Sequence, residues 1–195
     1  MTDPFTQQPL RIGIVDIPFI LRLQDLLWDA AKEKAEDPGV FFYDFGQHWG
    51  TEFYKELSER IGPAGHQSVS KPQDFLKDEF IEHLNSYLSY TGIGQFRITE
   101  GNKFYVINLK NSIDVGLDKP HAENMNVILS GFFGALFSAI SSSKLKCTGL
   151  SVERSADRNR FALSTGLIIE DIKVRLRNGA SEQNILAAYG NQHLE

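Results

Sequence analysis

Few residues in this sequence carry the groups that enzymes use as nucleophiles, bases or metal ligands. The chain has five His and a single Cys. A Cys–His nucleophile would need Cys147 close to a histidine such as His48, His66, His83 or His121. Cys147 opens an apolar strand-like segment, and such a Cys is typically a small core residue. His48 and His83 lie in helical patterns, without the three or four converging ligands that a metal site needs.

The common motifs for phosphate, cofactor and acyl chemistry are incomplete or absent. No Gly-x-x-x-x-Gly-Lys-Ser/Thr loop occurs, and no Gly-x-Ser-x-Gly elbow. Gly92-x-Gly94 lacks a third Gly and precedes a strand, which is not the dinucleotide fingerprint. His121-Ala122-Glu123 has the spacing that opens a zinc deaminase site, but no Pro-Cys-x-x-Cys follows it. The sequence therefore predicts no catalytic residues, no metal and no cofactor, and it favours a protein that acts by binding.

The residues that stand out are large apolar side chains at intervals of four, which we interpret as a stripe on one helix face. They are Phe41, Phe45, Trp49, Phe53 and Leu57. Beside them, Gly46 and Gly50 would let another backbone or a flat ligand approach closely. A second helical segment that contains Gly131 and Gly134 carries Phe132, Phe133 and Phe137.

Two interpretations of these rings are compatible. Phe at helical spacing usually packs in a core, against a sheet or another helix. Ligand pockets are also mostly apolar, with a few polar groups that fix orientation. On the second interpretation the seven aromatic residues form the wall of a cavity for an elongated or planar hydrophobic molecule. Arg97, on a predicted strand, would then meet the polar end of the ligand.

Length, charge and composition restrict the partners and the cellular location that we expect for this protein. The chain has 195 residues, with 20 Lys+Arg against 25 Asp+Glu, and 14 Phe. The net charge of −5 argues against nucleic acid as a partner, since phosphate affinity depends on clustered Lys and Arg. The polar first nine residues predict no targeting signal, and the single Cys fits a cytoplasmic protein. The apolar stretch 127–140 is short for a membrane span and predicts a buried helix.

The pattern along the chain predicts an α+β fold. Helices are expected over about 18–37, 39–61, 73–90 and 122–142. Strands over 93–99 and 104–109 form one hairpin, and strands over 146–153 and 158–165 form a second. Hairpins make antiparallel pairs, so a doubly wound parallel sheet is excluded. We expect one domain over residues 1–166, followed by a helical tail at 167–195 that packs on it or on a dimer partner.

Three segments resemble the 4-vinyl reductase domain family. They are Asn126–Phe137 with its spaced glycines, Cys147–Arg154, which ends a strand on Glu153, and Arg160–Leu163. The earlier part of the chain agrees, and the resemblance covers about residues 21–165. It implies a fold similar to the subunits of the TRAPP vesicle-tethering complex, with a helical layer on a twisted antiparallel sheet. It also implies a homodimer with an internal apolar cavity that binds small molecules or hydrocarbons.

The chain departs from that family at its metal site. Members carry Cys after the strand-ending Glu and before the last strand, where this sequence has Ser155 and Asn159. The helical half contains no Cys either, so a lipidated Cys like that of the TRAPP relatives is not expected. Our leading hypothesis is non-enzymatic binding of a small hydrophobic or aromatic molecule. The alternatives are an assembly module that acts through dimer or partner surfaces, and an accessory protein or enzyme of tetrapyrrole metabolism.

Overall fold

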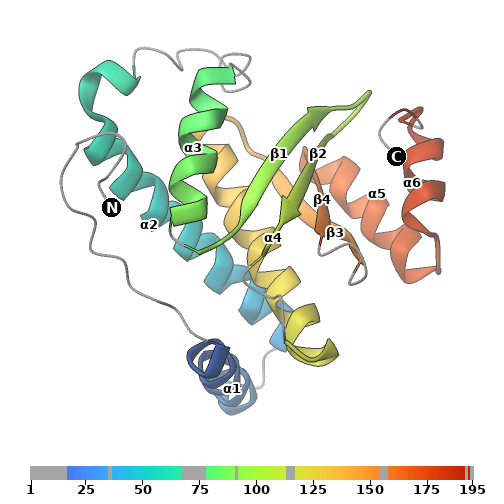
Figure 1. Cartoon of the computed structure of the whole chain (residues 1–195). Helices are drawn as coiled ribbons and strands as arrows, with labels where there is room; N and C mark the ends of the chain where they lie inside the picture. The colour runs from blue at the N-terminus through green and yellow to red at the C-terminus, as the bar shows by residue number, and fades with distance from the viewer. Residues whose placement is uncertain are drawn as a thin grey trace.

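A computed structural model describes residues 17–34, 37–66, 78–90, 92–112, 117–153, 158–191 and 193. Three helices, a hairpin, a fourth helix and a second hairpin follow one another along the chain, and two shorter helices end it (Figure 1). The elements are α1 (Ile17–Glu33), α2 (Pro38–His66), α3 (Asp78–Tyr90), β1 (Gln95–Glu100), β2 (Tyr105–Lys110), α4 (Lys119–Ser141), β3 (Lys146–Glu153), β4 (Arg158–Ser164), α5 (Gly166–Arg177) and α6 (Glu182–Ala188). The α+β prediction with two antiparallel hairpins is confirmed.

The two hairpins join through a pairing that is distant in sequence. The sheet has the order β1-β2-β4-β3, and all three pairings are antiparallel. Ile107 of β2 lies between Ile98 of β1 and Phe161 of β4. A bulge after Gly149 shifts the register of β3. Both β1 and β3 are therefore edge strands, and each needs protection from further pairing.

The helices α2 and α4 are in direct backbone contact. A Cβ on Gly46 would fall well inside 3.0 Å of the Ile128 carbonyl oxygen, and one on Gly131 would do the same at the Tyr43 carbonyl. The close approach expected at Gly46 is thus made by another backbone. Only glycine permits such an approach, and its conformational cost of roughly 1 kcal/mol in a helix must be offset by the packing that it allows.

Helix α2 extends further than the sequence predicts. We expected Gly62-Pro63 to end it, whereas the helix runs to His66. Pro63 lacks the N–H that would bond to the carbonyl four residues earlier. The helix continues for only one more turn, so few hydrogen bonds depend on the residues that Pro disturbs. At the other end, Asp37 accepts a hydrogen bond from the Gly39 N–H at 2.8 Å, and Pro38 begins the helix.

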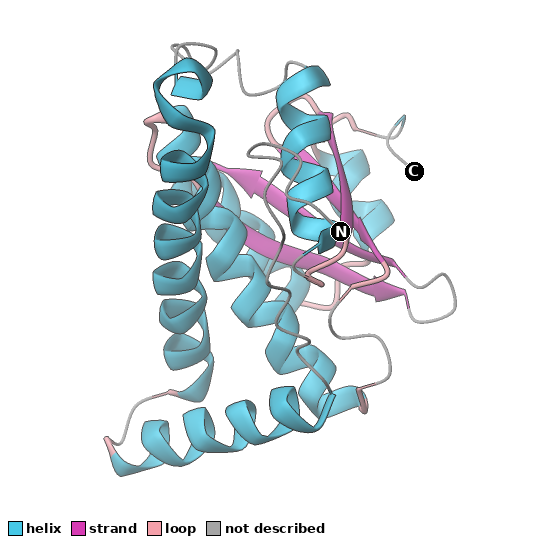
Figure 2. Cartoon of the chain, turned by 60° about the vertical axis from the view of Figure 1, so that its left-hand side comes forward, coloured by secondary structure: helices cyan, strands magenta, loops and turns pink. Residues whose placement is uncertain are grey.

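The sheet carries a hydrophobic core on each face. The first core lies toward α2, α3 and α4, and its largest fully buried rings are Phe42, Phe132, Phe133, Phe137 and Phe161. The second core lies toward the two terminal helices and consists of Phe104, Val106, Leu150, Ala162, Ile169, Ile172, Ile185, Leu186 and Tyr189. Because successive side chains of a strand point to opposite faces of the sheet, Val106 belongs to the second core and Ile107 to the first. The tail helices thus pack on the other face of the same sheet (Figures 1 and 2).

Helix α4 is apolar because it crosses the middle of the fold. Its most apolar window of 18 residues has a mean hydropathy of 1.4, enough in length and composition to span a membrane. In the structure 67% of that window is buried, between α2 on one side and the sheet on the other. Asp118 caps its first turn by accepting a hydrogen bond from the His121 N–H, and Ser142 ends it in the left-handed conformation.

Candidate functional site

The predicted rings of α2 and α4 meet in the first core. Trp49 lies over Phe132 with ring centroids 4.7 Å apart, and Phe53 meets Phe132 edge-on at 5.2 Å. Phe133 continues the cluster to Phe161 of β4 at 5.3 Å. Phe132, Phe133 and Phe137 are wholly buried and Phe53 nearly so. The chain thus contains a buried aromatic cluster in which the rings pack against one another.

The stripe on α2 does not follow a single face. Phe41, Phe45 and Trp49 are only partly buried, whereas Phe53 and Leu57 are buried. A step of four residues turns an α-helix by about 400°, so a row at strict i+4 spacing drifts by about 40° at each step. The face turned to the core is Phe42, Gly46, Gly50, Phe53 and Leu57. Phe42, which we did not single out, is 1% exposed and begins this face.

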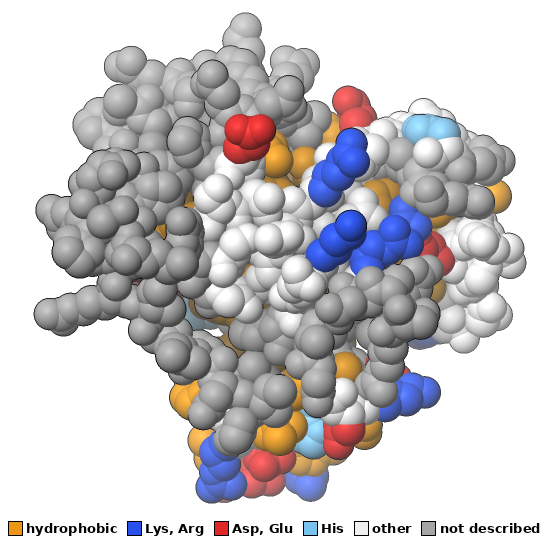
Figure 3. All heavy atoms as spheres, in the orientation of Figure 1, with side chains coloured by type: hydrophobic (Ala, Val, Ile, Leu, Met, Phe, Trp, Pro, Cys, Tyr) orange, Lys and Arg blue, Asp and Glu red, His pale blue; other side chains and the backbone are white. Residues whose placement is uncertain are grey.

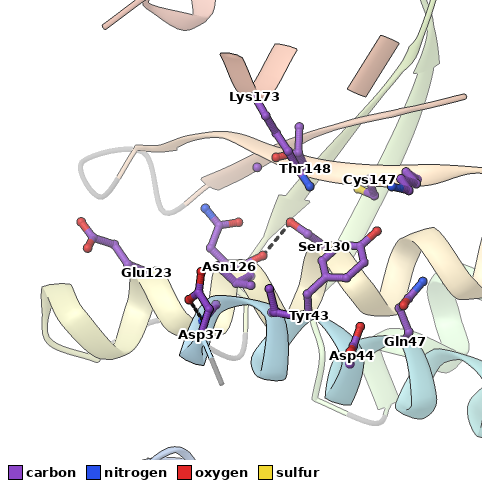
Figure 4. Close-up of a pocket in the computed structure, with 15 residues that line it drawn as sticks. Asp37, Tyr43, Asp44, Gln47, Glu123, Asn126, Ser130, Cys147, Thr148 and Lys173 are labelled. Carbon is purple, nitrogen blue, oxygen red and sulfur yellow. Dashed lines mark hydrogen bonds between the residues drawn. The ribbon is translucent and has the colours of Figure 1, made fainter. Parts of the chain in front are cut away.

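A groove of about 550 Å³ runs between α2, the first half of α4 and the edge strand β3 (Figure 4). Tyr43 of α2, Asn126 and Ser130 of α4, and Thr148 of β3 line it. Its apolar side chains are Val40, Val127 and Cys147. Charged residues also line it, namely Asp37, Asp44, Glu123, Lys146 and Lys173. Lys173 of α5 closes the groove from above, with its ammonium 5.2 Å from the centre of the Tyr43 ring. None of the seven predicted aromatic residues lines this groove.

Two polar atoms at the groove are buried without a hydrogen bond of good geometry. They are the Tyr43 hydroxyl and Oδ1 of Asn126. Burial raises the pKa of Tyr43 to about 12, although the backbone of Cys147 lies near its hydroxyl and acts to lower that pKa. The hydroxyl therefore stays protonated at neutral pH. A Cβ on Gly134 would lie 3.3 Å from that oxygen, so Gly134 provides the space it occupies. An unpaired buried hydroxyl is costly, and this one lies behind the wall of a groove of ligand size, closed off from solvent.

The lone thiol has no role as a nucleophile in this arrangement. Cys147 is fully buried in the first core, which confirms the expectation of a core residue. Burial raises the pKa of the thiol, so it stays neutral. Among the described residues, no group of three or more His, Cys, Asp or Glu side chains comes together. Asn159 is buried on β4, and Ser155 lies outside the described residues.

A second pocket, of about 480 Å³, lies on the face of the sheet that α5 and α6 cover in part. Arg97 of β1 is exposed and lines it, and it is the only one of the eight predicted site residues at either of these two pockets. The other charged lining residues are Lys110, Arg158 and Arg160. These residues come from three strands whose order does not follow from local sequence patterns, so the pocket was not predicted.

Comparison with known proteins agrees with this architecture. A crystal structure described as a vinyl-4-reductase family protein from Methanocaldococcus jannaschii has the same fold, with a TM-score of 0.54. The alignment covers 79% of this chain and 83% of that chain, at 14% sequence identity. No family model and no curated protein matches the sequence. The fold implied by the resemblance in sequence is thereby confirmed.

Proposed function

We propose that this protein is a non-catalytic binding domain for a small hydrophobic or aromatic molecule, held in the groove between α2, α4 and β3. The observation that carries the proposal is the unpartnered Tyr43 hydroxyl, buried beside a groove of about 550 Å³. A pocket of this size suits a drug-sized molecule, and a few fixed polar groups suffice to orient one. A small displacement of the Tyr43 side chain toward the groove would let its protonated hydroxyl donate a hydrogen bond to an oxygen of the ligand.

The groove rests on the aromatic cluster. Val127 lines the groove and also packs against the first core, while Ser130 immediately precedes Gly131 and Phe132 in α4. The hydroxyl of Ser130 donates to the Asn126 carbonyl at 2.8 Å (Figure 4). Rings that pack at 4.7 to 5.4 Å around Phe132 give these side chains a rigid base. On this proposal the predicted aromatic residues support the binding wall.

The test uses protein purified without added ligand. Organic extraction followed by mass spectrometry should release a small hydrophobic compound, and 1-naphthol should bind saturably when its fluorescence is followed. Val40→Trp should narrow the groove from its exposed edge, since Val40 is 55% exposed and lines it. We expect it to weaken naphthol binding about tenfold, equivalent to 1.4 kcal/mol.

Val174→Trp is the matched control, because Val174 is also exposed, at 46%, and does not line the groove. It should bind naphthol as the parent does. Equal binding by the two Trp variants would place the ligand elsewhere, and an empty protein that binds no neutral aromatic would exclude the proposal.

An assembly function is favoured by a separate observation on α1. Phe19 and Leu26 are 56% and 52% exposed, and their separation of seven positions, about two turns, places both on one side of the helix. Helix α1 lies across the ends of α2 and α4 (Figure 2), and the amide of Gln24 donates to the His121 carbonyl at 3.0 Å. We propose that a second copy of the chain covers this apolar side. Light scattering should find a dimer that Leu26→Glu dissociates and Val174→Glu does not.

A further inference from the structure

Three strands of the sheet align their basic side chains on one face. In the register of the sheet, Arg97 pairs with Asn108, which pairs with Arg160. Two residues further along, Gln95 pairs with Lys110, which pairs with Arg158. Side chains two apart on a strand share a face, and neighbouring strands lie about 4.8 Å apart. Four cationic side chains therefore project from two adjacent rows of three residues.

These rows form the floor of the pocket of about 480 Å³, which we call the basic pocket. The next row, Thr99, Val106 and Ala162, lies on the same face. Val106 and Ala162 of that row are covered by the second core, which includes Ile169 of α5 and Ile185 of α6. The terminal helices thus cover one end of this sheet face and leave the charged rows open at the other. In Figure 3 several Lys and Arg side chains lie together over the middle of the visible face, where Figure 1 draws the sheet.

Two of the four cations in the basic pocket lie beside a carboxylate-bearing residue, since Arg158 lies opposite Glu153 of β3 in the register of the sheet and Arg160 forms an ion pair. None of its lining residues is Asp or Glu. Glu182, at the start of α6, forms an ion pair with Arg160, and both side chains are buried. Arg97 and Lys110 are exposed and form no ion pair within the described part of the chain. A protein with a net charge of −5 thus concentrates positive charge at one concave place.

One cross-strand pair of cations in the basic pocket also opposes the stability of the sheet. Lys110 and Arg158 lie directly opposite each other on β2 and β4. Like charges in that relation repel, since their Cβ atoms are only about 5 Å apart. A bound anion between the two rows would remove this repulsion. One guanidinium group can bind two phosphate oxygens through parallel N–H bonds, and a Lys ammonium adds a point charge. Asn108, Gln95 and Thr99 provide neutral donors around the same space.

From this geometry we infer that the basic pocket binds a small molecule carrying phosphate groups, at a site separate from the groove beside Tyr43. Arg97 and Lys110 supply the accessible cations. Arg160 is held in place by its ion pair with Glu182 of α6. The pocket is compact and the rest of the chain is acidic overall, which favours a small polyanion over an extended nucleic acid.

The test is titration calorimetry of the full chain with inorganic pyrophosphate. We expect saturable binding that weakens as salt is raised, because the cations are solvent-accessible. Arg97→Gln and Lys110→Gln should each weaken binding about tenfold, and together should abolish it. Lys103→Gln is the matched control. It removes the same charge from an exposed residue near the β1–β2 turn that does not line the pocket, and it should bind as the parent does.

Thermal unfolding supplies a second readout that does not depend on detecting heat of binding. Pyrophosphate should raise the Tm of the parent and of Lys103→Gln, and leave that of the double variant unchanged. Without ligand, Lys110→Gln should have a Tm equal to or above that of the parent, since it removes one of two opposed like charges. Absence of pyrophosphate binding, equal binding by the double variant, equal affinity for citrate, or binding of single-stranded DNA alone would each overturn the inference.

Discussion

The ring and the hydroxyl of Tyr43 affect the stability of the fold in opposite directions. Its ring lies under the Lys173 ammonium and joins α2 to α5 across the edge of β3. Its hydroxyl is buried there without a hydrogen-bond partner. Folding gains from the burial of the ring and loses from the burial of the oxygen. A residue kept in that state stabilises the fold less than Phe would, and the difference is accounted for if the oxygen serves a ligand.

Tyr43→Phe should therefore separate stability from binding. At pH 7 we expect the variant to be as stable as the parent or more stable by about 1 kcal/mol, because an unsatisfied hydroxyl is removed. Naphthol binding should weaken by about tenfold. Urea unfolding and fluorescence titration measure the two effects. A loss of stability without a loss of affinity would assign Tyr43 a purely structural role.

The same residue predicts a difference in stability at alkaline pH. The pKa of Tyr43 is about 12 in the folded protein, above its ordinary value of about 10. The protonated form is thus favoured by folding, and its contribution is complete below pH 10 and lost as the pH rises from 10 to 12. The free energy of unfolding should fall more steeply over this range in the parent than in Tyr43→Phe. Tyr105 and Tyr189, whose pKa values burial also raises, titrate in both proteins. Parallel pH profiles would contradict the assignment.

At the scale of elements, the pairing of α2 with α4 organises the molecule. Gly46 and Gly50 of α2 face the backbone of α4 at Ile128 and Phe132, and Gly131 of α4 faces Tyr43 in return. The two helices approach so closely that the rings beside the glycines, Trp49 and Phe132, come into contact. This contact fixes the position of Tyr43 and Asn126 on either side of the groove. The glycines therefore determine the geometry of the candidate site.

Replacement of these glycines tests that conclusion. Gly46→Ala and Gly131→Ala each place a methyl group against a backbone carbonyl, which cannot move without shifting a helix. We expect each to reduce the free energy of unfolding by about 1–3 kcal/mol, and more where the helices separate. Gly166→Ala, whose Cβ would meet only the Lys146 side chain at 3.7 Å, is the control and should be neutral or slightly stabilising. Chemical unfolding measures all three, and equal effects would contradict the close contact.

The elements that depend on local pattern were predictable, and those that depend on distant pairing were not. The hairpins and helices follow from periodicity and turn residues, and the contact of Trp49 and Phe53 with Phe132 follows from two aromatic faces. The inward face of α2 was misplaced because a row at i+4 drifts around the helix. The basic pocket was missed because Arg97 meets Arg160 only through the β2–β4 pairing. The sequence does place two basic residues, Arg158 and Arg160, at alternate positions of one strand. No local pattern, however, indicates that this strand shares a sheet face with β1.

At the scale of the whole molecule, the sheet is a middle layer, and its two faces pack against different helices. The first core and the aromatic cluster support the groove, and the second core attaches the terminal helices. Glu182 at the start of α6 then reaches Arg160 in the basic pocket. The residues beyond 166, which the sequence suggested as a tail, thus cover part of one sheet face and contribute to one candidate site. Loss of their docking should expose an apolar sheet face as well as disturb the pocket.

Ile172→Asp tests whether the terminal helices are integral to the fold. Ile172 is fully buried between α5 and the sheet, so a charge there should cost at least about 3 kcal/mol, or detach the helices altogether. Val174→Asp, on the exposed side of the same helix, should stay within about 0.5 kcal/mol of the parent. Urea unfolding gives the energies, and binding of a hydrophobic dye reports the exposed sheet. Pyrophosphate affinity should fall with Ile172→Asp, because Glu182 no longer orients Arg160, whereas naphthol affinity should be retained wherever the first core stays folded. A variant that unfolds in two steps, the terminal helices before the rest, would show that they dock on an independently stable domain; a single cooperative transition would show that both faces of the sheet fold as one unit.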